Sequence, residues 1–330
     1  MNQMVLFLSR KDVESVLTMK EAIDAVEKGF REHGLATVNV PLRSAIRVDK
    51  HKGSVLFMPA YIEGMAALGV KVVSVYSDNP SKYNLPTTQG IVLLSDPKSG
   101  AVVAIMDGAF LTAMRTGAAS GLATKYLAKK DAKTVGLIGT GVQGRTQIAG
   151  VCEVRAIEKV KAYDIIADRC SSFCKEIRKE LEVDVVPVNS PELAVKGSDI
   201  VATSSTSKTP VLRGEWLDEG AHVNAIGSHS PDARELDATA IKRAKVVVDS
   251  RDAALKEAGD IIIPISEGII SPDHIYAELG EIITGKKAGR ESANEITIFK
   301  SQGLAIQDVS TASRVYEIAA KKGVGKVLDL

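Results

Sequence analysis

The spacing of apolar residues changes once along the chain, at about residue 134. Before this point, a helical stripe that contains Ala22, Ala25, Val26 and Phe30 is followed by a block of short β-rich segments. From Thr134 onward, short apolar runs rich in β-branched residues alternate with helical segments. Such alternation is typical of a parallel, doubly wound sheet. The pattern therefore predicts an α/β protein with a Rossmann sheet and a separate α+β part.

Two capping-box patterns, Ser9-x-x-Asp12 and Thr18-x-x-Glu21, predict a pair of helices at the start of the chain. A turn at 96–100 predicts a hairpin, and the small residues of 111–127 predict one tightly packed helix. Strands are expected in the first part at 41–48, 54–58, 69–77, 89–95 and 101–106, and in the second part at 135–138, 160–163, 185–188, 200–203, 222–226 and 246–248.

A helix at about 304–322 is expected to return to the first part of the chain, which makes that domain discontinuous. We therefore expect one domain from residues 1–118 with 304–330, and a Rossmann domain from residues 119–303. The length of 330 residues agrees with two domains, because single hydrophobic cores stop growing at about 250–300 residues.

The composition argues against several classes of protein. A net charge of +1 and 4% aromatic residues give no sign of a nucleic-acid footprint. The first apolar run, 4–8, is too short for a signal peptide or a membrane span, so we expect a cytoplasmic protein. Cys152, Cys170 and Cys174 fall in expected helices without accompanying histidines, which favours reduced thiols and no metal site.

The strand expected at 135–138 runs directly into Gly139-x-Gly141-x-x-Gly144. In this fingerprint the glycines allow a tight turn, close approach of a pyrophosphate, and close packing of the next helix. That helix, from about Val142, would point its free N–H groups at the phosphates. Asp164 follows about 25 residues after Gly139, at the end of the next strand, where a carboxylate suits two ribose hydroxyls and repels a 2′-phosphate. The pattern predicts NAD as the cofactor, although Asp164 alone would also suit the end of an ordinary strand.

Arg43 and Lys71 on expected strands, and Arg115 on the expected helix 111–127, are candidates for binding a carboxylate. Lys71 lies in an otherwise apolar run, where a buried amine is costly unless it is paired or functional. The alternative for Lys71 is the solvent face of its strand. His229 follows a strand of the expected parallel sheet, at the edge where ligands bind. The alternative for His229 is an ordinary loop residue.

Motifs spread over nearly the whole chain are similar to those of the ornithine cyclodeaminase/mu-crystallin family, which includes archaeal alanine dehydrogenases and ketimine reductases. They are Met58-Pro59-Ala60, Lys71, Leu85-Pro86-Thr87-Thr88-Gln89, Met106-Asp107-Gly108, Arg115-Thr116-Gly117-Ala118-Ala119, Gly139-Thr140-Gly141-Val142-Gln143 and Phe299-Lys300-Ser301-Gln302-Gly303.

The resemblance implies an N-terminal domain that binds substrate and forms a homodimer through its sheets, a Rossmann domain, and a substrate site between them. It implies that Arg43, Lys71 and Arg115 bind the substrate, with Lys71 as the favoured acid/base. His229 is not part of this family pattern, and from its place after a strand it is a candidate for a second acid/base or a water-binding residue. The residues implied to line the cofactor are Thr87, Thr88, Arg115, Val142, Gln143, Asp164, Thr203, Ser204, Ile226 and Ser301, together with Gly139, Gly141 and Gly144 of the fingerprint.

Two positions depart from the family pattern. Ornithine cyclodeaminases carry a glutamate where this chain has Leu56 and an aspartate where it has His229, so ornithine cyclisation is in doubt. We therefore expect NAD-dependent, reversible hydride transfer at the α-carbon of a small α-amino or α-imino acid. The alternatives are an ornithine cyclodeaminase that keeps NAD bound and a ligand-binding protein similar to mu-crystallin. The sequence does not identify which amino or imino acid is the substrate.

Overall fold

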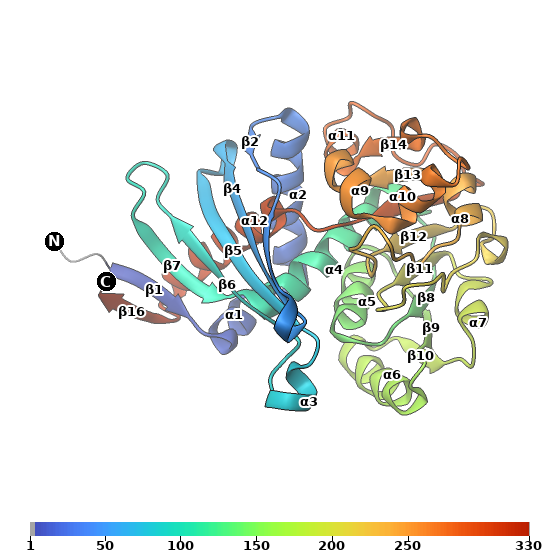
Figure 1. The fold of residues 1–330 in the computed structure, drawn as a ribbon. Helices are drawn as coiled ribbons and strands as arrows, with labels where there is room; N and C mark the ends of the chain where they lie inside the picture. The colour runs from blue at the N-terminus through green and yellow to red at the C-terminus, as the bar shows by residue number, and fades with distance from the viewer. Residues whose placement is uncertain (1–3, 330) are drawn as a thin grey trace. The chain divides into compact units, whose positions relative to one another are not determined.

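The computed structural model describes residues 4–329, which form two compact units (Figure 1). The first unit comprises Met1–Arg115 and Leu304–Leu330, and the second comprises Thr116–Gly303. Helix α4 (Gly108–Leu127) begins in the first unit and ends in the second. Within residues 4–329, none of the helices combines the length and the apolar character that crossing a bilayer requires.

The first unit contains a sheet in the order β16-β1-β7-β6-β5-β4-β2, with β3 paired to β4. Its pairings are antiparallel except between β1 and β7. The strands are β1 (Met4–Leu8), β2 (Val38–Asn39), β3 (Ser44–Val48), β4 (Gly53–Ile62), β5 (Ala67–Tyr76), β6 (Thr88–Ser95), β7 (Val102–Asp107) and β16 (Lys326–Asp329). The helices are α1 (Arg10–Val16), α2 (Met19–Leu35), α3 (Asn79–Tyr83) and α12 (Ala305–Lys322).

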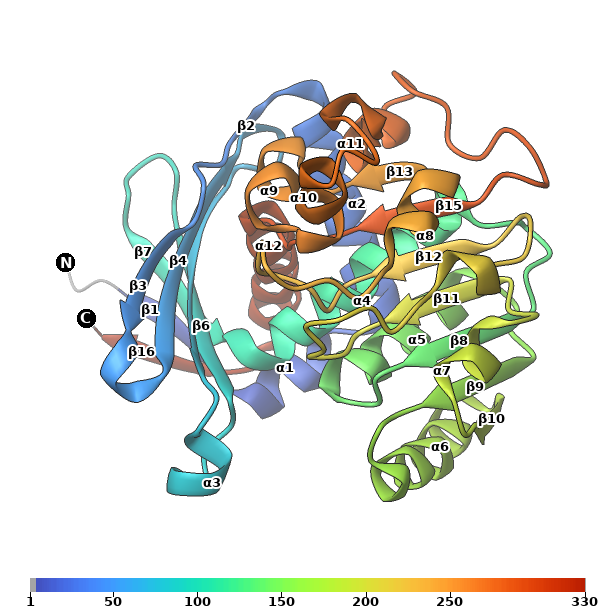
Figure 2. The same cartoon turned by 45° about the vertical axis from the view of Figure 1, so that its right-hand side comes forward.

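One face of this sheet is covered by α12, which packs against β4, β5 and β6 and is itself covered by α2 (Figure 2). The alternation of buried and partly exposed side chains along β5 follows from this arrangement. Ala67, Gly69, Lys71 and Val73 are buried, whereas the intervening residues are partly exposed. Because strand side chains alternate between faces, Lys71 lies on the side of the sheet that α12 covers.

The second unit contains a sheet in the order β10-β9-β8-β11-β12-β15-β13-β14, in which every pairing is parallel. Its strands are β8 (Thr134–Ile138), β9 (Lys159–Tyr163), β10 (Asp184–Pro187), β11 (Ile200–Thr203), β12 (His222–Ala225), β13 (Lys245–Val248), β14 (Ile275–Glu278) and β15 (Thr297–Lys300). Its helices are α5 (Val142–Val154), α6 (Ala167–Leu181), α7 (Pro191–Val195), α8 (Ala238–Arg243), α9 (Arg251–Glu257), α10 (Gly259–Ser266) and α11 (Leu279–Ile283).

Two apolar cores cover the two faces of the parallel sheet. Leu137 on β8 contributes to a core with α5 and α6, whereas the next residue, Ile138, contributes to a core with α7, α8 and α10. Successive strand residues point to opposite faces, so each strand supplies both cores. This is the doubly wound α/β arrangement that the sequence predicts.

Most predicted elements are confirmed. Ser9 and Thr18 cap α1 and α2, and Ser190 caps α7 with Pro191 at its first position. Strands β1, β2, β14, β15 and β16 were not predicted from the sequence. One placement was wrong: Arg43 precedes β3 instead of lying on it, because regular pairing with β4 begins at Ser44.

Candidate functional site

A buried group of charged side chains lies between β5 and α12 in the first unit. Lys71, on β5, is only 1% exposed, and its Nζ lies 2.8 Å from Oδ1 of Asp308, which is 0% exposed. Asp308 lies in the first turn of α12. The structure therefore gives the lysine a carboxylate partner and excludes the alternative that Lys71 faces solvent.

Arg115, on α4, joins the same group. Its Nε lies 3.0 Å from Oδ1 of Asp308, close enough for an ion pair, although the two atoms are not aligned as a hydrogen bond. Its Nη1 donates a hydrogen bond to Oε1 of Gln307. Lys71, Arg115 and Asp308 together carry a net charge of about +1. A buried excess of positive charge is costly, so this group favours the binding of an anion.

Two further observations support an anion or polar ligand at this group. Among the described residues, neither Oδ2 of Asp308 nor Nε2 of Gln307 has a hydrogen-bond partner, although both atoms are buried. Buried polar atoms normally have partners, and exceptions are common at functional sites. Arg115 and Asp308 thus fix one side of a site whose remaining polar atoms are available to a ligand.

The environment also changes the pKa of Lys71. Burial and the neighbouring Arg115 lower the pKa of the Lys71 amine to about 8, and the carboxylate of Asp308 keeps the pKa from falling further. A lysine with a pKa near neutrality can both donate and accept a proton. Arg43 contributes a weaker lowering of this pKa, so its charge acts on the same group from the segment before β3.

Asp308 and Gln307 were not predicted as site residues from the sequence. A signal was present, because two cations expected in apolar surroundings require a buried anion. Asp308 could have been found as the acidic residue in the first turn of the expected helix 304–322, between the apolar residues Ile306 and Val309.

The glycine-rich loop of the second unit has the geometry of a dinucleotide site. Gly139 adopts a φ of 99°, and a side chain at Gly144 would collide with the carbonyl oxygen of Gly139. Gly141 faces open space and serves as the N-cap of α5, where no side chain caps the first N–H groups. These free N–H groups and the helix dipole suit a pyrophosphate. The residues present therefore fit the cofactor that the sequence predicts, with Val142 and Gln143 at the start of the helix.

Asp164 lies at the end of β9, beside this loop. Its Oδ2 accepts hydrogen bonds of 2.9 Å from both the backbone N–H and the hydroxyl of Thr140, and its Oδ1 accepts one from the N–H of Ile166. The guanidinium of Arg169 binds both carboxylate oxygens. Burial raises the pKa of Asp164, but these hydrogen bonds outweigh burial, so the net pKa is lowered. Asp164 is therefore ionised, as an acceptor of ribose hydroxyls must be.

The remaining candidates of the second unit lie at the carboxyl ends of strands, where ligands bind in open α/β sheets. Buried Glu235 accepts hydrogen bonds from the N–H groups of Ser205 and Gly227, and thus ties together the loops after β11 and β12. Nδ1 of exposed His229 lies 3.2 Å from Oε1 of Gln302. Thr203 and Ile226 are buried, the hydroxyl of Ser204 donates to the carbonyl of Gly139, and the hydroxyl of Ser301 donates to Asp249.

Not all cofactor candidates lie in one unit. Thr87 and Thr88 are exposed at the start of β6, and they belong to the first unit together with Arg115. The candidates from Gly139 to Ser301 belong to the second unit. The structure thus brings the glycine loop, Asp164 and the strand ends together, and separately brings Lys71 and Arg115 together.

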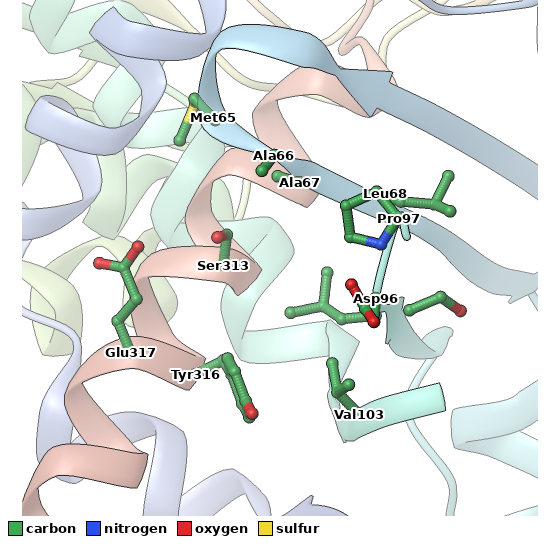
Figure 3. A pocket seen from close by; sticks show the side chains of 12 residues that line it. Met65, Ala66, Ala67, Leu68, Asp96, Pro97, Val103, Ser313, Tyr316 and Glu317 are labelled. Carbon is green, nitrogen blue, oxygen red and sulfur yellow. The ribbon is translucent and has the colours of Figure 1, made fainter. Parts of the chain in front are cut away.

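The first unit also has a cavity of about 350 Å³, shown in Figure 3. It is lined by the turns 65–68 and 95–97 and by Ser313, Tyr316 and Glu317 of α12. None of Arg43, Lys71 or Arg115 lines it. Because its charged lining groups are the acids Asp96 and Glu317, this cavity does not suit a carboxylate, and the group around Lys71 remains the candidate site.

A parallel sheet with a glycine loop and a buried acid after the second strand is typical of a dinucleotide-binding protein. The profile of the ornithine cyclodeaminase/mu-crystallin family matches residues 3–323. The chain belongs to this family.

Several known proteins are similar to it. A Δ1-pyrroline-2-carboxylate reductase of Bacillus cereus is 40% identical over 326 residues, which cover 98% of this chain and 100% of the reductase. The structure of the Thermococcus litoralis Δ1-pyrroline-2-carboxylate reductase with NADH and L-proline matches with a TM-score of 0.95 and 51% identity, and covers 98% of this chain and 99% of that one. An archaeal alanine dehydrogenase dimer with bound NAD matches with a TM-score of 0.93 and 38% identity, over 98% and 99% of the two chains.

These findings confirm the predicted family, the Rossmann fold and NAD as the cofactor. The chain is an NAD(H)-dependent oxidoreductase of α-amino and α-imino acids.

Proposed function

We propose that this enzyme reduces a cyclic α-imino acid, Δ1-pyrroline-2-carboxylate, to proline with NADH. The observation that carries the proposal is the buried Lys71–Arg115–Asp308 group, whose charge of about +1 fits a single carboxylate. The relatives that reduce this imino acid support the choice of substrate, since both match nearly the whole chain.

In this proposal Arg115 and Arg43 bind the substrate carboxylate. Arginine offers two parallel N–H groups, and such a clamp fixes the orientation of the α-carbon. Gln307 accepts a hydrogen bond from Arg115 and so holds its guanidinium in place. NADH, when bound, supplies the hydride to the α-carbon.

Lys71 donates a proton to the substrate nitrogen during reduction and accepts it in the reverse reaction. The pKa of about 8 suits both directions, and Asp308 sets the position of Nζ at 2.8 Å. His229, held by Gln302, is a second group that can hold a proton or a water molecule. The cofactor would be held by the residues of the glycine loop, Asp164 and the strand ends, with Thr87 and Thr88 as further contacts.

The test is NADH consumption with Δ1-pyrroline-2-carboxylate, beside its six-membered homologue and pyruvate with ammonia. We expect the five-membered imino acid to give the highest kcat/KM. Alanine dehydrogenase activity is the second candidate, because the archaeal alanine dehydrogenase matches with a TM-score of 0.93. A higher kcat/KM with pyruvate and ammonia would favour this second candidate over our proposal.

Ornithine is expected to be a poor substrate. Leu56 lies on β4, where its pairing partner on β5 is Val73, next but one to Lys71. An aliphatic side chain there supplies no charge for the terminal amine of ornithine. Release of ammonia from ornithine faster than any imine reduction would contradict this expectation.

We also propose a homodimer formed through the uncovered face of the first sheet. On the face opposite α12, the paired residues Phe57, Val72 and Ile91 form a row across β4, β5 and β6. Ile91 is 47% exposed, and Ile46 on β3 is 57% exposed on the same face. Exposed apolar patches of this kind mark protein interfaces, and the similar alanine dehydrogenase is a dimer.

We further propose a cytoplasmic location, supported by the free thiols of Cys152, Cys170 and Cys174.

A further inference from the structure

Three buried charged side chains are hydrogen-bonded to the loops of the parallel sheet. Glu235, Asp260 and Lys300 are each 0% exposed. Nζ of Lys300 lies 3.1 Å from Oδ2 of Asp260, and Oδ1 of Asp260 accepts hydrogen bonds from the backbone N–H groups of Glu235 and Leu236. Burial of charged groups is costly, and buried ion pairs are weak sources of stability. The group therefore points to a role beyond stability.

The carboxylate of Glu235 joins two loops that follow different strands. Its Oε1 accepts hydrogen bonds of 2.6 Å from the N–H and 2.7 Å from the hydroxyl of Ser205, after β11. Its Oε2 accepts one of 2.7 Å from the N–H of Gly227, after β12. A Cβ at Gly227 would lie 2.5 Å from Oε1 of Glu235 and 2.3 Å from the carbonyl oxygen of Ser205. The two loops therefore meet at the carboxylate, at a separation that only glycine permits.

Two residues at the end of β15 hold the next residue of the β12 loop. Nζ of Lys300 donates a hydrogen bond of 2.8 Å to the carbonyl oxygen of Ser228, and Nε2 of Gln302 donates one of 3.1 Å to the same oxygen. Oε1 of Gln302 lies 3.2 Å from Nδ1 of His229. The loop after β12 is thus held both by β15 and by Glu235.

These loops lie in the part of the sheet that remains for the nicotinamide half of the cofactor. The glycine loop after β8 and Asp164 after β9 suit the pyrophosphate and the adenosine ribose. In a doubly wound sheet, the second mononucleotide lies beyond the point where the strand order reverses, which here means the ends of β11, β12 and β15. The hydroxyl of Ser204 donates a hydrogen bond to the carbonyl of Gly139. The loops that Glu235 joins therefore continue the surface that begins at the glycine loop.

We propose that Glu235 is a positioning residue for the nicotinamide half of NAD(H), because it fixes the loops after β11 and β12 against each other and so forms the surface on which this half lies. The inference rests on the proposed placement of the cofactor along the strand ends. A glutamine at this position would keep the volume of the side chain, but one of its two polar atoms is a donor. Whichever way the amide turns, it faces an N–H group of Ser205 or Gly227, so one loop is released.

The experiment is calorimetric binding of NADH and of 5′-ADP to the full chain. Both ligands contain the adenosine half, and only NADH contains the nicotinamide half. Glu235→Gln should weaken NADH by about tenfold or more, the size of a lost hydrogen bond to a charged group, and change 5′-ADP by less than about twofold. Glu267→Gln is the matched control, because Glu267 pairs with the neighbouring Arg234 and is partly exposed. It should change neither dissociation constant.

Ser205→Ala tests the same connection without changing a buried charge, and it carries the test if Glu235→Gln does not fold. It removes the hydrogen bond of 2.7 Å from the hydroxyl to Glu235, so it should weaken NADH by a smaller factor and leave 5′-ADP unchanged. The two substitutions together should weaken NADH by less than the product of their separate effects, since they act on one contact. Independent effects would mean that Ser205 acts without Glu235.

Three results would overturn the proposal. The first is an equal loss of NADH and 5′-ADP in Glu235→Gln, and the second is unchanged NADH binding in a variant that only unfolds more easily. Either would reduce Glu235 to a stabilising residue. The third is a wild-type protein that binds NADH no more tightly than 5′-ADP. Since no imino acid is present, none of these results depends on the proposed substrate, and circular dichroism checks that the variants are folded.

Discussion

Nζ of Lys71 and Oδ1 of Asp308 form a buried ion pair of 2.8 Å between residues separated by 237 positions in the sequence. The surroundings of Lys71 act on the pKa of its amine in opposite directions. Burial and Arg115 lower its pKa, and Asp308 raises it, which leaves the pKa at about 8. A substitution at either neighbour should therefore change the pH dependence of the enzyme in a direction that the structure specifies.

Replacement of Lys71 by methionine should remove the proton donor while keeping most of the side-chain volume. We expect kcat for imine reduction to fall by about 10²–10⁴-fold, the usual contribution of a general acid. NADH binding, measured by fluorescence titration, should be unchanged. Lys98→Met, at an exposed turn, is the control and should keep wild-type activity. Wild-type kcat in Lys71→Met would remove Lys71 from the chemistry.

The two directions of the reaction should depend oppositely on pH. Reduction requires the protonated amine of Lys71, so its kcat/KM should fall as the pH rises through about 8. Oxidation of proline requires the neutral amine, so its kcat/KM should rise over the same range. Initial rates in both directions across this pH range check the sign. If kcat/KM changed in the same direction with pH for both reactions, Lys71 would be ruled out as the group that they share.

In Asp308→Asn, the fall of kcat/KM for reduction with rising pH, which is the alkaline limb of the pH profile, should move to lower pH. The reason is that the carboxylate that raises the pKa of Lys71 is lost. It should also lower the free energy of unfolding by about 3–5 kcal/mol, since two cations lose a buried partner. Denaturant unfolding measures the second effect, and retained NADH binding shows that the second unit is folded. An unchanged pH profile in a folded variant would argue against electrostatic control of Lys71 by Asp308.

Arg115→Met should act mainly through substrate binding. We expect KM to rise by about tenfold or more, with a smaller change in kcat, because a carboxylate contact is shared by the ground and transition states. The alkaline limb should move to higher pH, opposite to Asp308→Asn, since Arg115 lowers the pKa of Lys71. A shift in the same direction as Asp308→Asn would contradict this assignment.

Ile91→Glu should disrupt the proposed dimer. A charge in the apolar row of Phe57, Val72 and Ile91 would be buried without a partner in an interface. Sedimentation equilibrium should then report a monomer, in contrast to a wild-type dimer. Leu255→Glu, on α9 of the second unit, is the control at a residue of 38% exposure. A dimer that persists in Ile91→Glu would exclude this face as the interface.

The second unit could be predicted in detail because its signals are local. Gly139, Gly141 and Gly144 follow β8 directly, and Ser190 and Pro191 mark the start of α7 within two residues. Strands β14 and β15 were missed, because β15 joins the sheet between β12 and β13 through pairings that a local pattern does not encode. The parallel sheet itself followed from the alternation of strands and helices.

The site in the first unit was harder to predict. Lys71 and Arg115 were candidates because a cation in apolar surroundings is unusual, but solvent exposure of Lys71 remained an alternative. Only the packing of α12 on β5 decides between the two, and this contact joins distant parts of the sequence. Arg169 was missed for a different reason. Arg169 lowers the pKa of Asp164 only because its rotamer places the guanidinium on the carboxylate, and a rotamer is not encoded by a local sequence pattern.

The division of the first unit into two stretches of sequence has a consequence for synthesis on the ribosome. Residues 116–303 leave the ribosome before α12, so the nucleotide-binding unit is complete while Lys71 and Arg115 still lack Asp308. Domains usually fold in the order in which they are made. Here the unit that contains β5 is the last to gain its core helix, so Lys71 on the sheet and Arg115 on α4 stay without their carboxylate partner until α12 has been made.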